Sequence, residues 1–450
     1  MSFVRAHYFH RNILPSRQIS FLQPPKITLG KSNSHFLRLS QLKSFTKSVS
    51  TSSSSLQEGI NPIFTAYPFI TFFSSLMLVD LIYTFCQNKC TKYHIIKTFE
   101  NGNQPKVEIS HSKYLSRSEM IDQLKNIFNP HEDQSFYHII YGINGIGKST
   151  LVKTASKEVG QGVIYVEIPA SVYDLNEAIA KALNMSPNKF TFTNRIARSF
   201  LEGSKEPELK QYLEAIKYGA EVYKRKHGKP PVIIYDNVDH LVAKHSKILD
   251  LLQNDAKKSA DDKKYITVFV SGKNSTFNKM YSNKHIWPHA KKLVMEIGEL
   301  SKEESMNYLV NKRGIKTIKE GRIDTTEAEK LYELVGGNIR DLSNVADKFL
   351  NNASFEDIKQ HKLNRVFRKF CNAKLNKNQV YHKAGKNVIE ALLYNNKMLD
   401  YLTYRKFFNN PDEADEVLEA NVFAHHPEKH TVTFESRVIE RYVQENAQYI

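Results

Sequence analysis

The sequence predicts an α/β fold in which a parallel β-sheet carries helices on both faces. Two observations predict it. Short, almost continuous apolar runs alternate with helix-like segments across residues 113–300, and a glycine-bearing turn follows the first of these runs. Strands that are apolar throughout are typical of parallel sheets buried on both faces, whose strands are joined by helical crossovers. The 450 residues suffice for two or three domains.

The first 60 residues differ from the rest of the chain in charge. They carry eight lysines and arginines against a single acid, Glu58, in a chain whose formal net charge is +17. A long basic stretch that is rich in hydroxyl side chains and lacks a compact apolar core is typical of a mitochondrial presequence, and plain disorder is the alternative. We therefore expect residues 1–60 to be a disordered targeting segment that directs the protein to mitochondria.

An apolar run follows from Ile63 to Cys86, and its single charge is Asp80. A run of this length can cross the hydrocarbon core of a bilayer as a helix, and aromatic residues near its ends suit the two interfaces. A buried core helix is the alternative. The run predicts a single-pass helix at 63–86 in a mitochondrial membrane, the inner one by preference. The flanking charges leave the side of the membrane open, and a polar linker follows at 87–112.

The expected elements of the sheet domain then follow one another along the chain. Apolar residues at helical spacing predict a helix from about residue 118 to 128. Strands are expected at 137–141, 162–168, 230–236, 265–271 and 292–297, and helices at 175–183, 207–226 and 246–254. The carboxyl ends of parallel strands are where such folds bind ligands, so the site residues should lie there.

The first strand leads into GINGIGKST, which matches the pattern G-x-x-x-x-G-K-[ST] between a strand and a helix. Glycines let backbone N–H groups turn toward phosphates, and the helix that follows offers its positive N-terminal end. We expect Lys148 to reach the β- and γ-phosphates of ATP and Ser149 to bind Mg²⁺, whereas a chance glycine-rich turn is the alternative. The candidate nucleotide-binding residues are Gly142, Ile143, Asn144, Gly145, Ile146, Gly147, Lys148, Ser149 and Thr150.

Four polar residues further along the chain are candidates to complete this site. The apolar run before Asp236 delivers its carboxylate to a strand end, where it can hold Mg²⁺ through water. Asp239 is the next carboxylate and could polarise the attacking water, and Ser271 ends the following strand facing the γ-phosphate region. Arg340 lies in the first turn of a helix after a glycine pair, where it could lean over the phosphates. Each has a plain alternative as a turn or surface residue.

Taken together, these segments resemble the AAA+ and STAND-type P-loop ATPases, and within them the archaeal-type ATPase family. The resemblance rests on YLSRSEMIDQLKNIF, GINGIGKST, VIIYDNVDHL, GELSKEESMNYL and GGNIRDL, and spans about residues 113–349. It implies a helical lid at 301–352 whose Arg340 senses the nucleotide, and it places Arg117 near the adenine. Asn237 departs from the family pattern, which has a glutamate base there, and no arginine finger is recognisable.

The last part of the chain, residues 353–450, begins with a basic amphipathic helix. Nine lysines and arginines and no acid lie between Asp357 and Glu390. Such a face can meet nucleic acid or anionic lipid, and a solvated surface is the alternative. Expected helices at 388–393 and 413–418 and a hairpin at 421–434 suggest a winged-helix-like α+β domain. His425 and His426 are expected to be plain loop histidines rather than metal ligands.

The sequence as a whole predicts a membrane-anchored ATP-binding protein. It would be a Mg²⁺-dependent ATPase that acts as a molecular switch or remodelling factor on an unidentified protein client. Two alternatives stay open. Asn237 favours a scaffold that binds ATP without hydrolysing it, and the basic segment allows a nucleic-acid-tethering module. Oligomerisation is compatible with each of these hypotheses.

Overall fold

The computed structural model describes residues 62–108, 113–185, 206–282, 294–319 and 322–446. The chain divides into two units, 1–73 and 74–450, and the description below concerns the second unit unless it says otherwise. The predicted presequence at 1–60 lies outside the described residues. The mitochondrial location therefore stays a prediction.

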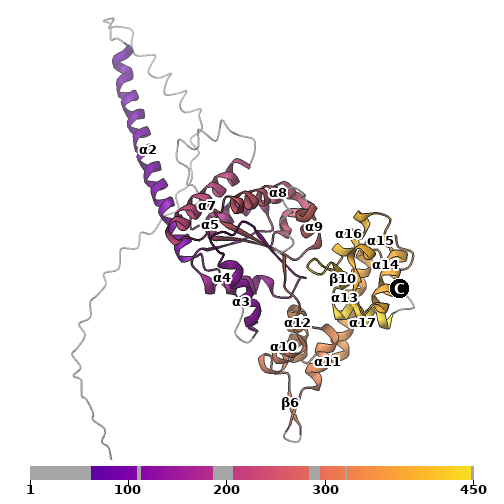
Figure 1. Ribbon diagram of the computed structural model, residues 1–450. Helices are drawn as coiled ribbons and strands as arrows, with labels where there is room; N and C mark the ends of the chain where they lie inside the picture. The colour runs from indigo at the N-terminus through magenta and orange to yellow at the C-terminus, as the bar shows by residue number, and fades with distance from the viewer. Residues whose placement is uncertain (1–61, 109–112, 186–205, 283–293, 320–321, 447–450) are drawn as a thin grey trace, which may run out of the picture. The chain divides into compact units, whose positions relative to one another are not determined.

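A five-stranded sheet forms the centre of the second unit (Figure 1). Its strands are β1 (His138–Tyr141), β2 (Val163–Glu167), β3 (Val232–Asp236), β4 (Ile266–Ser271) and β5 (Val294–Glu296), and they lie in the order β2-β3-β4-β1-β5. All neighbouring pairs are parallel. The register pairs Asp236 with Glu167, and Tyr141 with both Ser271 and Glu296, so the carboxyl ends of the strands align at one edge.

Helices cover both faces of the sheet, as the sequence predicts (Figure 1). One face packs against α3 (Ser118–Phe128) and α4 (Lys148–Val159), with buried side chains such as Leu124 and Val152. The other packs against α5 (Leu175–Ala182), α7 (Glu206–His227) and α8 (Asp239–Asp261), with side chains such as Ile216 and Leu249. Every residue of β3 is buried, which accounts for its unbroken apolar run.

Two helices beside the site differ from the expectation. Helix α8 begins at Asp239 rather than near residue 246, and its backbone leaves helical geometry at His245. Polar residues in its first two turns hide the apolar pattern there, although Leu241 is fully buried. Helix α9 (Asn274–Ser282) was not expected, because its sequence, NSTFNKMYS, is mostly polar. Both helices begin just after a strand end that faces the site.

Helix α2 (Pro62–Asn101) starts in the first unit and contains the whole segment 63–86. Across the part of the chain that the structure describes, no helix is both long enough and apolar enough to cross a membrane. The prediction of a membrane-spanning helix at 63–86 is therefore not supported. Hydroxyl side chains and the charge at Asp80 interrupt the apolar run.

A small helical region follows the sheet, as expected for the lid. It comprises α10 (Lys302–Asn307), the helical turn η3 (Tyr308–Lys312), α11 (Thr326–Val335) and α12 (Ile339–Leu350), with a hairpin of β6 (Thr317–Lys319) and β7 (Arg322–Asp324) between η3 and α11. Helix α11 ends at Gly336, whose φ of 71° favours glycine. Asn338 caps α12 by accepting a hydrogen bond from the backbone of Asp341.

The C-terminal part has the predicted winged-helix order. Helices α13 (Phe355–Asn372) and α14 (His382–Tyr394) precede β8 (Leu399–Asp400), α15 (Tyr401–Lys406), α16 (Pro411–Glu419), the hairpin of β9 (Phe423–His426) and β10 (Thr431–Phe434), and α17 (Arg437–Glu445). The three strands form one sheet in the order β8-β10-β9. One continuous hydrophobic core joins this domain to the lid, from Leu300 to Val443.

Candidate nucleotide-binding site

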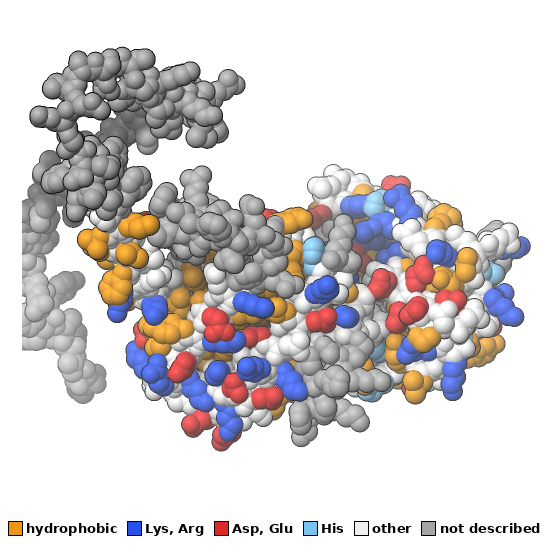
Figure 2. Space-filling view, turned by 90° about the horizontal axis from the view of Figure 1, so that it is seen from above, with side chains coloured by type: hydrophobic (Ala, Val, Ile, Leu, Met, Phe, Trp, Pro, Cys, Tyr) orange, Lys and Arg blue, Asp and Glu red, His pale blue; other side chains and the backbone are white. Residues whose placement is uncertain are grey.

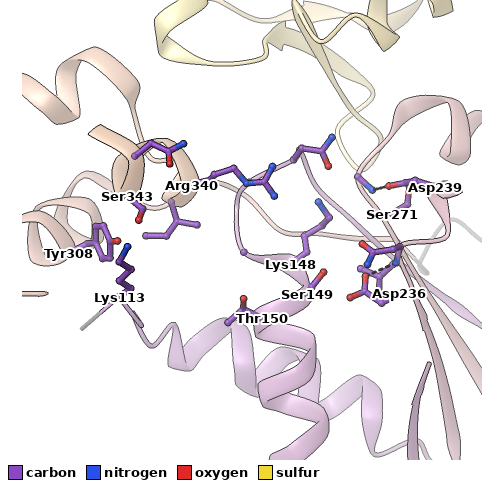
Figure 3. A pocket seen from close by; sticks show the side chains of 18 residues that line it. Lys113, Lys148, Ser149, Thr150, Asp236, Asp239, Ser271, Tyr308, Arg340 and Ser343 are labelled. Atoms are coloured by element: carbon purple, nitrogen blue, oxygen red, sulfur yellow. Dashed lines mark hydrogen bonds between the residues drawn. The ribbon is translucent and has the colours of Figure 1, made fainter. Parts of the chain in front are cut away.

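A cavity of about 400 Å³ opens at the carboxyl ends of the central strands (Figure 3). Its wall comes from the loop between β1 and α4, the end of β3 with the start of α8, the end of β4 and the lid helix α12. Lys113, which precedes α3, and Tyr308 of η3 complete it. Of the residues predicted for the site, Asn144, Gly145, Gly147, Lys148, Ser149, Thr150, Asp236, Asp239, Ser271 and Arg340 line it. Residues from widely separated parts of the chain therefore meet at one pocket.

The loop after β1 has the backbone that a phosphate-binding turn needs. Gly145 and Gly147 have φ values of 93° and 91°, and Gly147 stands at the start of α4. The ammonium of Lys148 donates to the carbonyls of Gly142 at 2.6 Å and Ile143 at 3.0 Å. Burial lowers the pKa of Lys148 to about 8, against the opposing attraction of Asp239 and Asp236. A positive charge thus lies at the centre of the cavity.

The three other predicted loop residues, Gly142, Ile143 and Ile146, lie outside the cavity wall. Ile146 is buried in the core beneath the loop. Ile143 faces a neighbouring cavity between the lid and the C-terminal domain. These two side chains hold the loop in place, and only their backbone groups can face phosphates.

Asp236 and Ser149 form the oxygen pair predicted to bind Mg²⁺. The carboxyl of Asp236 is almost completely buried, and the hydroxyl of Ser149 lines the same cavity. Burial raises the pKa of Asp236, and its interaction with Ser149 opposes the rise. The backbone N–H of Asn237 donates to Oδ1 of Asp236 at 2.7 Å, and the hydroxyl of Tyr165 donates to Oδ2 at 2.6 Å. Mg²⁺ prefers oxygen ligands and keeps several waters, so a hydroxyl beside a carboxylate fits this ion.

Asp239 and Ser271 belong to one hydrogen-bonded group. Oδ1 of Asp239 accepts from the hydroxyls of Ser271 at 2.6 Å and Thr276 at 2.7 Å. Its Oδ2 accepts from the backbone N–H of Gly272 at 2.8 Å. Both oxygens thus accept hydrogen bonds from residues 271–276, the stretch that runs from the end of β4 into α9. Asp239 lines the cavity as predicted, and this geometry makes it a brace for that stretch.

Asn237 has a left-handed backbone, with φ of 59°. Asparagine tolerates this conformation much better than longer side chains do, which cost roughly 1 kcal/mol or more there. The local backbone thus favours asparagine where the resemblance implies a glutamate. Among the residues that line the cavity, the carboxylates are Asp236 and Asp239. The first is buried beside Ser149, and the second is held by three donors.

The lid touches the phosphate loop directly. The backbone N–H of Arg340 donates to the carbonyl of Gly145 at 3.0 Å, and the side-chain amide of Asn338 donates to the carbonyl of Asn144 at 3.0 Å. A Cβ on Gly145 would lie 2.6 Å from Oδ1 of Asn338, so the close approach requires glycine. The guanidinium of Arg340 points into the cavity on the side of Lys148 (Figure 3). The sequence did not reveal the role of Asn338 in this contact.

Arg117 lies beside the site rather than in the main cavity. Its guanidinium donates to the carbonyl of Gly298 at 3.0 Å and pairs with Glu304 at 3.3 Å. It borders a second cavity of about 70 Å³, whose wall also includes Thr150 and the apolar residues Leu300 and Ile339. An apolar pocket that adjoins a phosphate loop suits a nucleotide base. The predicted position of Arg117 near the adenine is compatible with this arrangement.

Fold and site together define a P-loop nucleotide-binding protein. Residues 114–345 match a family of ATPase domains described as predominantly from Archaea. Because the match spans more than half of the chain, the protein belongs to this ATPase family. No curated protein matches the chain.

Several solved structures resemble the fold at a distance. A Walker-type ATPase of Pyrococcus abyssi is 13% identical, with 76% of this chain and 98% of that chain covered and a TM-score of 0.47. The ORC2 protein of Aeropyrum pernix, in its ADPNP–ADP complexes, is 12% identical, with 78% and 99% covered and a TM-score of 0.38. AMPPCP-bound DnaA of Aquifex aeolicus is 15% identical, with 72% and 90% covered and a TM-score of 0.33.

Proposed function

We propose that the protein is an ATP-dependent molecular switch that holds Mg²⁺-ATP between its sheet domain and its lid and hydrolyses it slowly. One observation carries the proposal: the phosphate loop, Asp236 and Arg340 of the lid line a single cavity, and the lid is hydrogen-bonded to the loop itself. Bound nucleotide would therefore contact both parts. Ligands that bind one arrangement of two parts better than another shift the balance between them.

Each residue has a proposed part in binding. Lys148 would leave the carbonyls of Gly142 and Ile143 and pair with the phosphates, since a phosphate is a stronger acceptor than a carbonyl. The loop amides and the N-terminal end of α4 would bind phosphate oxygens. Ser149 and Asp236 would hold Mg²⁺, which when bound neutralises phosphate charge. Arg340 would bind the phosphates from the lid side.

Slow hydrolysis follows from the carboxylates of the cavity. A base that orients and deprotonates water typically contributes 10²–10⁴-fold to such a reaction. Asn237 has no carboxylate, and both oxygens of Asp239 already accept hydrogen bonds from Ser271, Gly272 and Thr276. The specific alternative of a scaffold that never hydrolyses ATP rests on the same observation. The two hypotheses differ only in whether turnover is slow or absent.

The binding proposal is tested by Lys148→Ala in the full-length protein, with calorimetric titration of Mg²⁺-ATP. A hydrogen bond to a charged group contributes about 1.5–3 kcal/mol, so affinity should fall by roughly 10- to 100-fold. Lys157→Ala is the matched control. Lys157 lies on the same helix but is exposed and is not part of the cavity wall. Equal affinity of the Lys148 variant and the wild type would refute the proposed site.

The nucleic-acid hypothesis gains no support from the C-terminal domain. Helix α16, which precedes the wing hairpin, is acidic, and Asp415 on it bonds to Asn278 of α9. In the basic helix α13, Lys362 pairs with Asp341 and Lys369 pairs with Glu435, each at 2.7–2.8 Å. On the face shown in Figure 2, basic and acidic side chains are intermingled. Several of the charges that suggested this role therefore stabilise the fold.

A further inference from the structure

Tyr165 is a buried residue of the edge strand β2 that touches the candidate metal site. Its side chain is 5% exposed, and its hydroxyl donates to Oδ2 of Asp236 at 2.6 Å. The register of β2 and β3 pairs Glu167 with Asp236, so Tyr165 and Asp236 lie on the same face of neighbouring strands. The hydroxyl therefore fixes one oxygen of the carboxylate, while the N–H of Asn237 fixes the other.

Tyr165 is itself held from outside the sheet. Because β2 is an edge strand, the N–H and C=O of Tyr165 on its outer side have no neighbouring strand to bond to. The side chain of Asn103 pairs with both groups. Oδ1 of Asn103 accepts from the N–H of Tyr165 at 2.9 Å, and Nδ2 donates to its carbonyl at 2.6 Å. The segment after α2 thereby substitutes for a sixth strand at this point. Two backbone hydrogen bonds hold the same segment against the sheet. The N–H of Gly162 donates to the carbonyl of Phe99, and the N–H of Asn103 donates to the carbonyl of Val163.

We propose that Tyr165 is a positioning residue for the Mg²⁺ site, and that Asn103 supports it. The phenol holds the carboxylate of Asp236 in the orientation that it has beside Ser149. Asn103 holds the strand that carries the phenol. The proposal rests on the proposed function, because it concerns the metal that accompanies ATP. It adds a physical connection between the segment that follows helix α2 in the sequence and the nucleotide site.

The orientation of a carboxylate matters because Mg²⁺ demands near-ideal octahedral geometry. A carboxylate buried without its second donor can rotate about its Cβ–Cγ bond and lose alignment with the Ser149 hydroxyl. Loss of an outer partner of a metal ligand typically costs 10- to 100-fold in metal affinity. It should cost little in the binding of metal-free nucleotide, because that depends on Lys148 and the loop amides.

The test compares ATP affinity in EDTA with ATP affinity at saturating Mg²⁺, in the full-length protein. For Tyr165→Phe, we expect an unchanged affinity in EDTA and a gain from Mg²⁺ that is about 10-fold smaller than in the wild type. Asn103→Ala should reduce the gain in the same direction by less. Mn²⁺ in place of Mg²⁺ supplies a second readout, because the electron paramagnetic resonance spectrum of the bound ion should broaden in Tyr165→Phe.

Tyr137→Phe is the matched control. Tyr137 is 4% exposed and immediately precedes β1, but its hydroxyl bonds to Gln253 at 3.1 Å on the other face of the sheet. This variant should keep the full gain from Mg²⁺. An undiminished gain in Tyr165→Phe, or an equal loss in EDTA and in Mg²⁺, would overturn the inference and leave the proposed function standing. Absence of ATP binding by the wild type would overturn both.

Discussion

Asp239 shows how hydrogen bonds can tie a candidate catalytic side chain to the wall of its site. It follows the strand-end aspartate by three residues and lines the cavity, which is where a catalytic carboxylate is expected. Its three donors, however, come from Ser271 at the end of β4, from Gly272 just after it and from Thr276 on α9. A carboxylate in this position orders the wall of the site. We therefore infer a structural contribution to nucleotide binding.

Asp239→Asn should lower stability as well as nucleotide affinity. The neutral amide would replace three hydrogen bonds to a charged carboxylate by hydrogen bonds to a neutral group, which contribute less. The difference of about 1 kcal/mol lowers Tm by a few degrees for a domain of this size. Thermal denaturation of the ATP-free protein measures the effect.

The control for this variant is Asp250→Asn on the same helix. Asp250 makes one long ion pair with Lys279 at 3.6 Å and is partly exposed, so its loss should change Tm little. If Asp239→Asn kept the Tm and the ATP affinity of the wild type but lost all turnover, Asp239 would be the catalytic base and the structural account of it would be refuted.

The sequence predicts the residues of the site that act through a local motif. Lys148 and Ser149 follow from the glycine spacing, and Asp236 follows from the buried strand before it. Tyr165 and Asn338 could not be predicted in this way. Their contacts join residues 71 and 194 positions apart, and they depend on which strands are neighbours and where the lid meets the loop. No sequence pattern around Tyr165 or Asn338 indicates these long-range contacts.

At the scale of elements, helix α9 lies between the nucleotide site and the winged helix. Thr276 on α9 bonds to Asp239, and Asn274 and Asn278 on the same helix bond to His425 and Asp415 of the C-terminal domain. His425 also stacks on Tyr401, with ring centroids 4.1 Å apart. This helix escaped prediction because its residues are polar. Those polar side chains make its contacts on both sides.

The contact through His425 should weaken in acid. Burial lowers the pKa of His425 to about 3, below its ordinary value of 6.5, so the folded state favours the neutral ring. Stability from this group is complete above pH 6.5 and is lost as the pH falls toward 3. At pH 5 the loss is about 2 kcal/mol. The Tm of the wild type should therefore fall more steeply between pH 7.5 and 5 than that of His425→Phe.

His430→Asn is the control for the acid effect. His430 is exposed on the same hairpin and has a φ of 52°, which asparagine tolerates. This variant should keep the steep pH dependence of the wild type. Parallel Tm curves for wild type and His425→Phe would show that the buried ring does not link the wing to α9.

At the scale of the whole second unit, two bodies meet at the site. The sheet and its helices form one, and the lid shares a continuous core with the winged helix and forms the other. The order of strands and helices was predictable, because buried strands and amphipathic helices have distinct periodicities. The core shared by the lid and the winged helix could not be predicted, because it depends on tertiary packing. The same holds for the two places where this body contacts the sheet domain, at the phosphate loop and at α9.

This division explains why nucleotide is proposed to act as a switch. ATP that bridges Lys148 and Arg340 would join the two bodies at the cavity, while α9 joins them at the wing. Hydrolysis would weaken the first contact by removing the γ-phosphate. Because both carboxylates of the cavity wall already accept hydrogen bonds from the protein, that step should be slow, and the ATP-bound form should persist.

The most direct test is a single-turnover measurement on the full-length protein. Excess protein is mixed with limiting radiolabelled Mg²⁺-ATP, and bound ATP and released phosphate are followed in the same sample. Typical enzymes turn over at about 1–10³ s⁻¹, and the absence of a general base removes about 10²–10⁴-fold. We predict that ATP binds and is hydrolysed at roughly 0.1 s⁻¹ or more slowly. Failure to bind ATP, or hydrolysis at rates of about 10 s⁻¹, would contradict the account.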